Sequence, residues 1–154
     1  MKFIDLFAGI GGFHLAFHNL GAECVFASEI DVHARKTYEH NFKKISPHLF
    51  KKDLYNDDIL KITKPAEQIP DFDVLCAGFP CQPFSQAGFK RGFKETLQDR
   101  GNMFFKICNI LSEKRPKAFF LENVRHLINH DEGRTFEIVK ECLTEQLGYT
   151  FDYK

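Results

Sequence analysis

The sequence alternates short apolar runs with longer stretches whose apolar residues recur at helical spacing. The apolar runs lie at residues 3–7, 24–28, 49–52, 72–77 and 118–121, and the helical stretches lie at residues 13–20, 32–42, 102–113 and 135–146. Strands that alternate with helices imply right-handed crossovers. We therefore predict an α/β protein with a mostly parallel sheet and helices on both faces. A last strand is expected from Tyr149 onward, which leaves the sheet incomplete at its C-terminal edge.

Size and charge restrict the possible partners. The 154 residues are enough for one domain with a sizeable core. Lys and Arg number 21, as do Asp and Glu, so the formal net charge is zero. A protein that works mainly by neutralising phosphates is expected to be basic overall, so any nucleic-acid contact has to be local or come from outside this chain.

The cysteines indicate a reducing, cytosolic compartment. Their number is odd, five, and no signal peptide precedes them. Cys24, Cys76 and Cys108 lie within apolar runs, which predicts that they pack as small hydrophobic residues. The longest uncharged run, residues 74–89, contains two prolines and is too short to span a bilayer. No second Cys or His pair completes a four-ligand zinc framework, so a metal site is not favoured.

Parallel sheets bind ligands at the carboxyl ends of their strands, so the residues that follow each strand are the candidates. Glycines follow the first strand at residues 9, 11 and 12, where a following helix would offer free N–H groups. A dinucleotide fingerprint would need a third glycine at His14, which weakens that interpretation. Glu29 follows the second strand, twenty positions after Gly9, and Asp53 follows the weak third strand. Together these residues suggest a ligand that contains a nucleoside.

Two further strand ends offer reactive groups. Cys81 lies between Pro80 and Pro83 after the fourth strand, which makes it a candidate nucleophile. Glu122 ends the apolar fifth strand, where partial desolvation would raise its pKa and let it exchange a proton. A solvated carboxylate is the simpler alternative for Glu122 alone. His14, by contrast, is expected to be an ordinary helix-surface or half-buried histidine.

Three segments together resemble the cytosine-5 DNA methyltransferases of bacterial restriction-modification systems. They are FIDLFAGIGG at residues 3–12, GFPCQPFSQAG at residues 78–88 and ENV at residues 122–124, in the order and spacing of that family. The resemblance extends over essentially the whole chain. It implies a Rossmann-like methyltransferase fold, S-adenosyl-L-methionine as cofactor and double-stranded DNA as substrate.

The resemblance also implies roles for individual residues. Glu29 would hold the ribose hydroxyls, and Asp53 would bind the adenine amino group. The other cofactor contacts would be Phe7, Gly9, Ile10, Gly11, Gly12, Gly78, Pro80 and Met103. The Cys81 thiolate would add to C6 of a flipped cytosine while Glu122 binds the ring N3 and the exocyclic amine. C5 would then accept the methyl group, lose its proton and release Cys81.

Residues 85–101 resemble the mobile catalytic loop of the family. Gln82, Ser85, Lys90 and Arg91 are expected to contact DNA as that loop closes. The Gln-Arg-Arg-like motif and the target-recognition region of the family are not found in the chain. We therefore expect residues 1–154 to be the N-terminal part of the cofactor-binding and catalytic domain, with little activity alone and a complementary C-terminal chain as a further partner.

Three alternatives stay open at this point. The first is a cytosine methyltransferase that acts on transfer RNA. The second is a module that binds cofactor or assembles with a partner without catalysing a reaction. The third is a dehydrogenase, which would bind NAD rather than a sulfonium cofactor.

Overall fold

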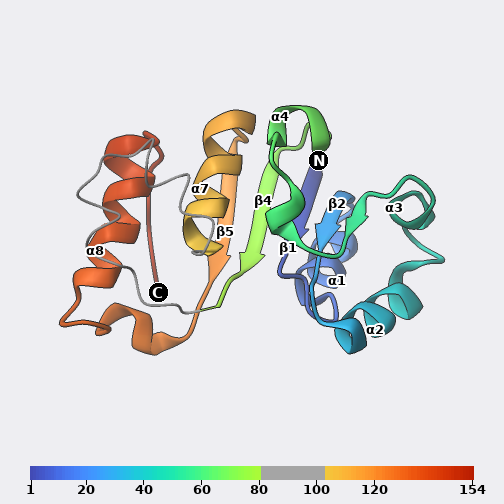
Figure 1. Cartoon of the computed structure of the whole chain (residues 1–154), viewed down its shortest axis with the longest axis horizontal. Coiled ribbons are helices and arrows are strands. Elements are labelled where there is room, and N and C mark those ends of the chain that lie inside the picture. The colour runs from blue at the N-terminus through green and yellow to red at the C-terminus, as the bar shows by residue number, and fades with distance from the viewer. Residues whose placement is uncertain (81–102) are drawn as a thin grey trace. The chain divides into compact units, whose positions relative to one another are not determined.

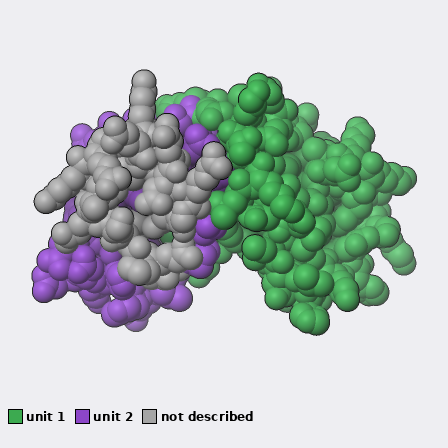
Figure 2. Space-filling view, in the orientation of Figure 1, with its two compact units in different colours: residues 1–79, 113–122 green, residues 80–112, 123–154 purple. Residues whose placement is uncertain are grey.

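The computed structural model describes residues 1–80 and 103–154. The chain divides into two compact units, which Figure 2 colours green and purple. The first comprises residues 1–79 and 113–122, and the second comprises residues 80–112 and 123–154. Among the described helices, none is both long and apolar enough to cross a membrane.

The first unit is built on a five-stranded sheet (Figure 1). Its strands are β1 (Lys2–Leu6), β2 (Glu23–Ser28), β3 (Tyr55–Asn56), β4 (Val74–Gly78) and β5 (Ala118–Glu122). Their order is β3-β2-β1-β4-β5, and every neighbouring pair is parallel. This confirms the predicted α/β class. The chain moves from β1 toward β3 and then returns to the other side of β1, so the topological switch point lies at the ends of β1 and β4.

Three helices of this unit pack against one face of the sheet: α1 (Gly12–Asn19), α2 (Val32–Phe42) and α3 (Pro47–Lys51). The short turns η1 (Ile59–Lys61) and α4 (Pro65–Gln68) lie between β3 and β4 in the sequence. Phe3, Cys24 and Cys76 of the sheet share one core with Tyr38 and Phe42 of α2. The burial of Cys24, Cys76 and Cys108 confirms that they pack as small hydrophobic residues.

Two of the expected strands are wrong. Residues 49–52 belong mostly to helix α3, because Pro47 fits the first turn of a helix and helical spacing buries Leu49. The third strand instead comprises Tyr55 and Asn56. No strand begins at Tyr149, because its N–H group donates to the carbonyl of Leu143 and closes the preceding helical turn.

The described part of the second unit is helical. Helix α7 (Met103–Lys114) begins in it, and η2 (Arg125–Ile128), α8 (Arg134–Glu141) and the π-helical turn η3 (Cys142–Gln146) follow Glu122. The helix expected at residues 135–146 is therefore real but changes to wider π-helical turns at Cys142.

The start of α1 leaves no room for a side chain. Gly11 precedes the helix with a φ of 97°, and a Cβ atom there would overlap the Phe42 ring of α2. Gly12 lies one residue further on, and a Cβ atom there would meet nothing within 4 Å. The close approach of α1 to α2 therefore depends on one of two adjacent glycines.

We expect Gly11→Ala to lower the free energy of unfolding by about 1–3 kcal/mol, through overpacking and a disfavoured φ. Gly12→Ala is the matched control and should leave stability unchanged or slightly raised, since alanine is the better helix former. Urea unfolding of both variants measures the difference. Equal stability of the two variants would contradict the packing described here.

Candidate functional site

The glycine-rich turn after β1 is the centre of the carboxyl edge of the sheet. Phe7 and Gly9 both have a φ of 54°, which is uncommon for a phenylalanine. The N–H group of Ala8 donates to Ser28 at 3.0 Å, and that of Gly11 donates to Ala8 at 2.8 Å. The turn is thus folded tightly onto the end of β2, and the positive φ at Phe7 marks a strained position at a candidate cofactor contact.

Glu29 joins the ends of three strands. One oxygen of its carboxylate accepts from the Gly9 N–H group at 2.7 Å, and the other accepts from Asp31 at 2.8 Å. Its own N–H group donates to Asn56 at the end of β3 at 3.1 Å. Each carboxylate oxygen can accept a second hydrogen bond, so Glu29 keeps acceptor capacity for a ligand hydroxyl.

The space around Glu29 is open and partly apolar. A Cβ atom at Gly9 would meet nothing within 4 Å. Ile10 and Ile30 are exposed by 62% and 69%, and Val32 by 59%. Exposed aliphatic side chains beside a fixed carboxylate are suited to a ligand that joins a flat apolar ring to hydroxyl groups.

Gly78 and Glu122 lie beside each other at the ends of β4 and β5. They are register partners, and a Cβ atom at Gly78 would lie 3.3 Å from a carboxylate oxygen of Glu122. The Phe13 ring of α1 lies next to both, at 3.9 Å from the same Cβ position. The structure therefore places Glu122 against the strand that leads through Phe79 and Pro80 into residue 81.

Five predicted site residues lie outside the described residues: Cys81, Gln82, Ser85, Lys90 and Arg91. Met103 is described as the first residue of α7, in the second unit. Glu122 is exposed, and the neighbouring Phe120 is 55% exposed. Of the two interpretations of Glu122, the solvated strand-end carboxylate fits the structure, because within the described residues β5 has a neighbouring strand on one side only.

The sequence suggested that Asp53 follows the third strand, but in the structure it precedes that strand. It lies between α3 and β3 with a φ of 53°, before β3 begins. The acids that follow β3 are Asp57 and Asp58. Asp57 contacts Lys61 with both oxygens at 2.8 Å, whereas Asp58 accepts from the Leu60 N–H group with one oxygen. Sequence reasoning missed these two acids because it placed the strand six residues too early.

Asp5 is a buried acid beneath the turn that the sequence analysis did not single out. It lies in register between Ala27 of β2 and Cys76 of β4 and is fully buried. Neither of its carboxyl oxygens has a hydrogen bond of good geometry in the described structure. Burial raises the pKa of Asp5 well above its usual value, and the nearby N–H group of His14 opposes that rise. The sequence signal that could have identified Asp5 is the presence of an acid within an otherwise apolar strand.

His14 is fully buried, and the expectation of a helix-surface or half-buried histidine is wrong. It is 1% exposed, and its ring stacks on Phe42 with centroids 3.9 Å apart. Its Nδ1 atom lies 2.6 Å from the Tyr38 hydroxyl, and its Nε2 atom lies 3.0 Å from the Ser46 hydroxyl. Hydroxyl groups can donate or accept, so both ring nitrogens of a neutral imidazole are satisfied. Burial accordingly lowers the pKa of His14 to about 4.

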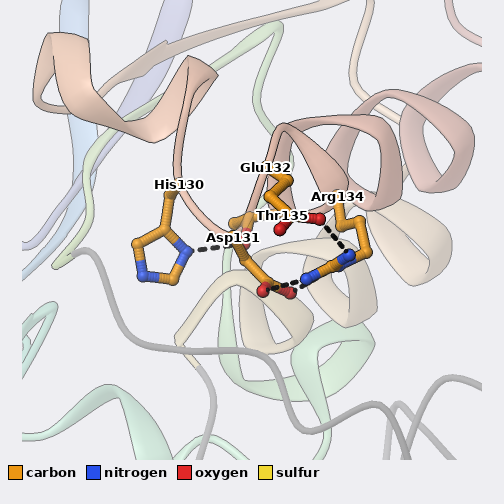
Figure 3. A network of polar contacts seen from close by, with 5 residues as sticks. All are labelled: His130, Asp131, Glu132, Arg134 and Thr135. Carbon is orange, nitrogen blue, oxygen red and sulfur yellow. Dashed lines mark hydrogen bonds and ion pairs between the residues drawn. The ribbon is translucent and has the colours of Figure 1, made fainter.

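A separate polar cluster precedes α8 (Figure 3). Arg134 contacts Asp131 at 2.6 Å and Glu132 at 2.7 Å, and both acids have positive φ. The His130 ring contacts the buried Thr135 hydroxyl at 2.7 Å. These partners satisfy one another, and the acids lie near the helix N-terminus, where negative charge is favourable. The cluster therefore serves to start α8.

Comparison with known proteins decides the family. All 154 residues match the family model for C-5 cytosine-specific DNA methylase. The chain belongs to this family. It is 52% identical over 148 residues to the Type II methyltransferase M.HpaII of Haemophilus parainfluenzae, and 46% identical over 154 residues to M.HhaI of Haemophilus parahaemolyticus. The match covers 96% and 100% of this chain but 38% and 42% of those two relatives.

Two solved structures are similar to this chain in fold. A Spodoptera frugiperda DNMT2 mutant matches with a TM-score of 0.60 and 26% identity, over 92% of this chain and 41% of that protein. Dnmt2 of S. pombe matches with a TM-score of 0.58 over 90% of this chain and 38% of that protein, at 24% identity, which shows the fold alone. Membership in the methylase family sets the dehydrogenase alternative aside.

The buried His14 makes stability depend on pH. The unfolded chain takes up a proton near pH 6.5, whereas the folded chain resists until about pH 4. The free energy of unfolding should therefore fall by up to about 3 kcal/mol as the pH drops through this window. Urea unfolding at several pH values measures this slope, and His14→Gln should reduce it. A variant that keeps the full slope would exclude His14 as its source.

Proposed function

We propose that this chain binds S-adenosyl-L-methionine and transfers its methyl group to C5 of cytosine in double-stranded DNA. Residues 1–154 are assigned to the cofactor-binding and catalytic part of the enzyme. The observation that supports this most directly is the contact between Gly78 and Glu122, at the end of the strand that leads into Cys81. It sets an acid at the end of the strand that precedes the proposed nucleophile in the sequence, on the same sheet edge as the glycine-rich turn and Glu29.

The residues around the turn fit the cofactor. Open space lies over Gly9 and Gly12, so a ligand can approach the backbone closely. Glu29 would accept hydrogen bonds from the ribose hydroxyls, and the exposed Ile30 side chain offers an apolar surface for the adenine ring. Phe7, Ile10, Gly11 and Gly78 complete the proposed contacts within the first unit, and Pro80 and Met103 of the second unit stay predictions from the family resemblance. When bound, the sulfonium group supplies an electrophilic methyl group.

The structure favours a different acid for the adenine amino group from the one expected. Asp58 follows β3 at the carboxyl edge, and it uses one oxygen to accept from Leu60. Asp57 is engaged with Lys61 through both oxygens, and Asp53 precedes the strand. Because ligands bind beyond the carboxyl ends of parallel strands, we assign this contact to Asp58.

Cys81 and Glu122 are assigned the chemistry. Cytosine must leave the duplex stack to be reached, which costs a few kcal/mol. The Cys81 thiolate adds to C6, so that a carbon–sulfur bond forms and electron density moves to C5. Glu122 would bind N3 and the exocyclic amine and stabilise the charge that develops in this addition. C5 accepts the methyl group, its proton leaves to a base, and the bond between Cys81 and C6 breaks.

The assignment of the adenine contact is tested by calorimetry with S-adenosylhomocysteine. We expect Asp58→Asn to weaken binding by about tenfold, the loss of one charge-assisted hydrogen bond. Asp53→Asn is the matched control and should bind as the unmodified chain does. Weaker binding by Asp53→Asn and unchanged binding by Asp58→Asn would assign the adenine contact to Asp53 and contradict our assignment to Asp58.

The covalent step is tested with duplex DNA that contains 5-fluorocytosine, whose C5 fluorine cannot leave as a proton does. With S-adenosylmethionine present, we expect a complex that survives denaturing electrophoresis. Because trapping needs only one turnover, a slow chain still gives a signal. Cys81→Ser should abolish the complex and Cys76→Ala, a buried cysteine of β4, should retain it.

Three results would contradict the proposal. Trapping that survives Cys81→Ser would exclude Cys81 as the nucleophile. Trapping on a matched 5-fluorocytosine transfer RNA but not on duplex DNA would favour the RNA alternative. No trapping on either substrate, together with intact cofactor binding, would favour a module that binds cofactor without catalysing the reaction.

A further inference from the structure

The cations of the first unit are concentrated in one segment. Residues 32–52 contain six Lys and Arg residues but one acid, Glu39. The cations are Arg35, Lys36, Lys43, Lys44, Lys51 and Lys52. This gives a charge of +5, and since the whole chain is neutral, the other residues have a charge of −5. The zero net charge therefore hides a strong asymmetry, which is typical of a surface with a charged partner.

The structure arranges this segment so that its charges face solvent. In α2, Tyr38 and Phe42 are buried, and the exposed residues Lys36, His40 and Lys43 recur four and three positions apart. This spacing puts them on one stripe of the helix. Lys44, Lys51 and Lys52 continue the exposed charge through the next turn and α3. We call the exposed lysines of residues 36–52 the basic face.

The lysines of the basic face differ from others in the chain. Within the described residues, only Lys43 of this face has an ion pair, to Glu39 at 2.7 Å. Four exposed lysines elsewhere each contact an acid: Lys61, Lys64, Lys117 and Lys140. The basic face thus keeps most of its charge free for a partner, whereas the other lysines are locally neutralised.

The basic face is distinct from the methyl-transfer site. Helix α2 starts at the carboxyl edge of the sheet, where Asp31 accepts from Ala34. Helix α3 lies at the other end of β2, where His48 contacts the Cys24 carbonyl at 2.7 Å. The face therefore extends from the edge that bears Glu29 toward the opposite edge, and none of its lysines belongs to the proposed cofactor or catalytic residues.

We propose that the basic face binds the phosphate backbone of duplex DNA without sequence preference. Free lysines spread from α2 through the following turn to the end of α3 match a line of phosphates better than a single anion. The family of the chain favours DNA over an acidic protein as the polyanion. Such a contact holds DNA flanking or distant from the target cytosine, and it goes beyond the proposed function because it needs neither cofactor nor cytosine.

The test measures binding of the chain to a short duplex made only of A·T pairs, by fluorescence anisotropy over a range of salt concentrations. This duplex contains no cytosine, so failure of the proposed methyl transfer does not affect the result. The variant replaces Lys36, Lys44, Lys51 and Lys52 with glutamine. The control replaces the paired lysines Lys61, Lys64, Lys117 and Lys140 with glutamine, which changes net charge equally.

We expect the slope of log affinity against log salt to decrease by about 3.6 in the basic-face variant, near 0.9 for each of the four phosphates that are no longer neutralised. Affinity at low salt should fall at least tenfold, and the control should change little. Equal losses in both variants would overturn the proposal, since net charge alone would then explain binding. Equal competition by polyglutamate would also overturn it, because the face would then bind acidic chains in general.

Discussion

The Phe42 ring lies so close to Gly11 that a side chain does not fit at the start of α1. The carboxyl edge of the sheet, where we propose that a ligand binds, depends on where this helix begins. The Gly9 N–H group, two residues before Gly11, donates to the Glu29 carboxylate at 2.7 Å and joins the turn after β1 to the end of β2. His14, in the first turn of α1, also stacks on Phe42 and bonds to Tyr38. The turn is therefore held by packing against α2 and by a charged acceptor at the end of β2.

Three acids near this edge show how environment separates similar groups. Glu29 has both oxygens satisfied by N–H groups, so its negative charge is stabilised. Asp5 is fully buried with no such partners, and burial favours its neutral form. Glu122 is exposed at the end of an edge strand. A ligand that covers this edge would change the solvation of Glu122 most, which is the behaviour expected of an acid that handles a proton.

The sequence predicted the elements whose physical signals are local. Helix α2 was predicted with its bounds because Asp31 caps it and apolar residues recur at helical spacing. The prediction of a third strand at residues 49–52 was wrong because a short apolar run fits a helix or a strand equally well. Pro47, at the first turn, favours the helix. That error displaced Asp53 from the ligand edge. The burial of His14 depended on hydroxyls of Tyr38 and Ser46, which are distant in sequence and carry no local signal.

Overall charge was the least informative quantity in the sequence. A net charge of zero argues against binding by the whole surface, but binding is local, and the Debye length in physiological salt is about 8 Å. Over that distance, Lys51 and Lys52 respond to their neighbours on α3 and not to acids on distant parts of the chain. Glu39 is the one acid among residues 32–52, and its ion pair with Lys43 is exposed on both sides and therefore weak. Each surface separately sets the charge that a partner meets, and here the carboxyl edge of the sheet presents acids whereas the basic face presents lysines.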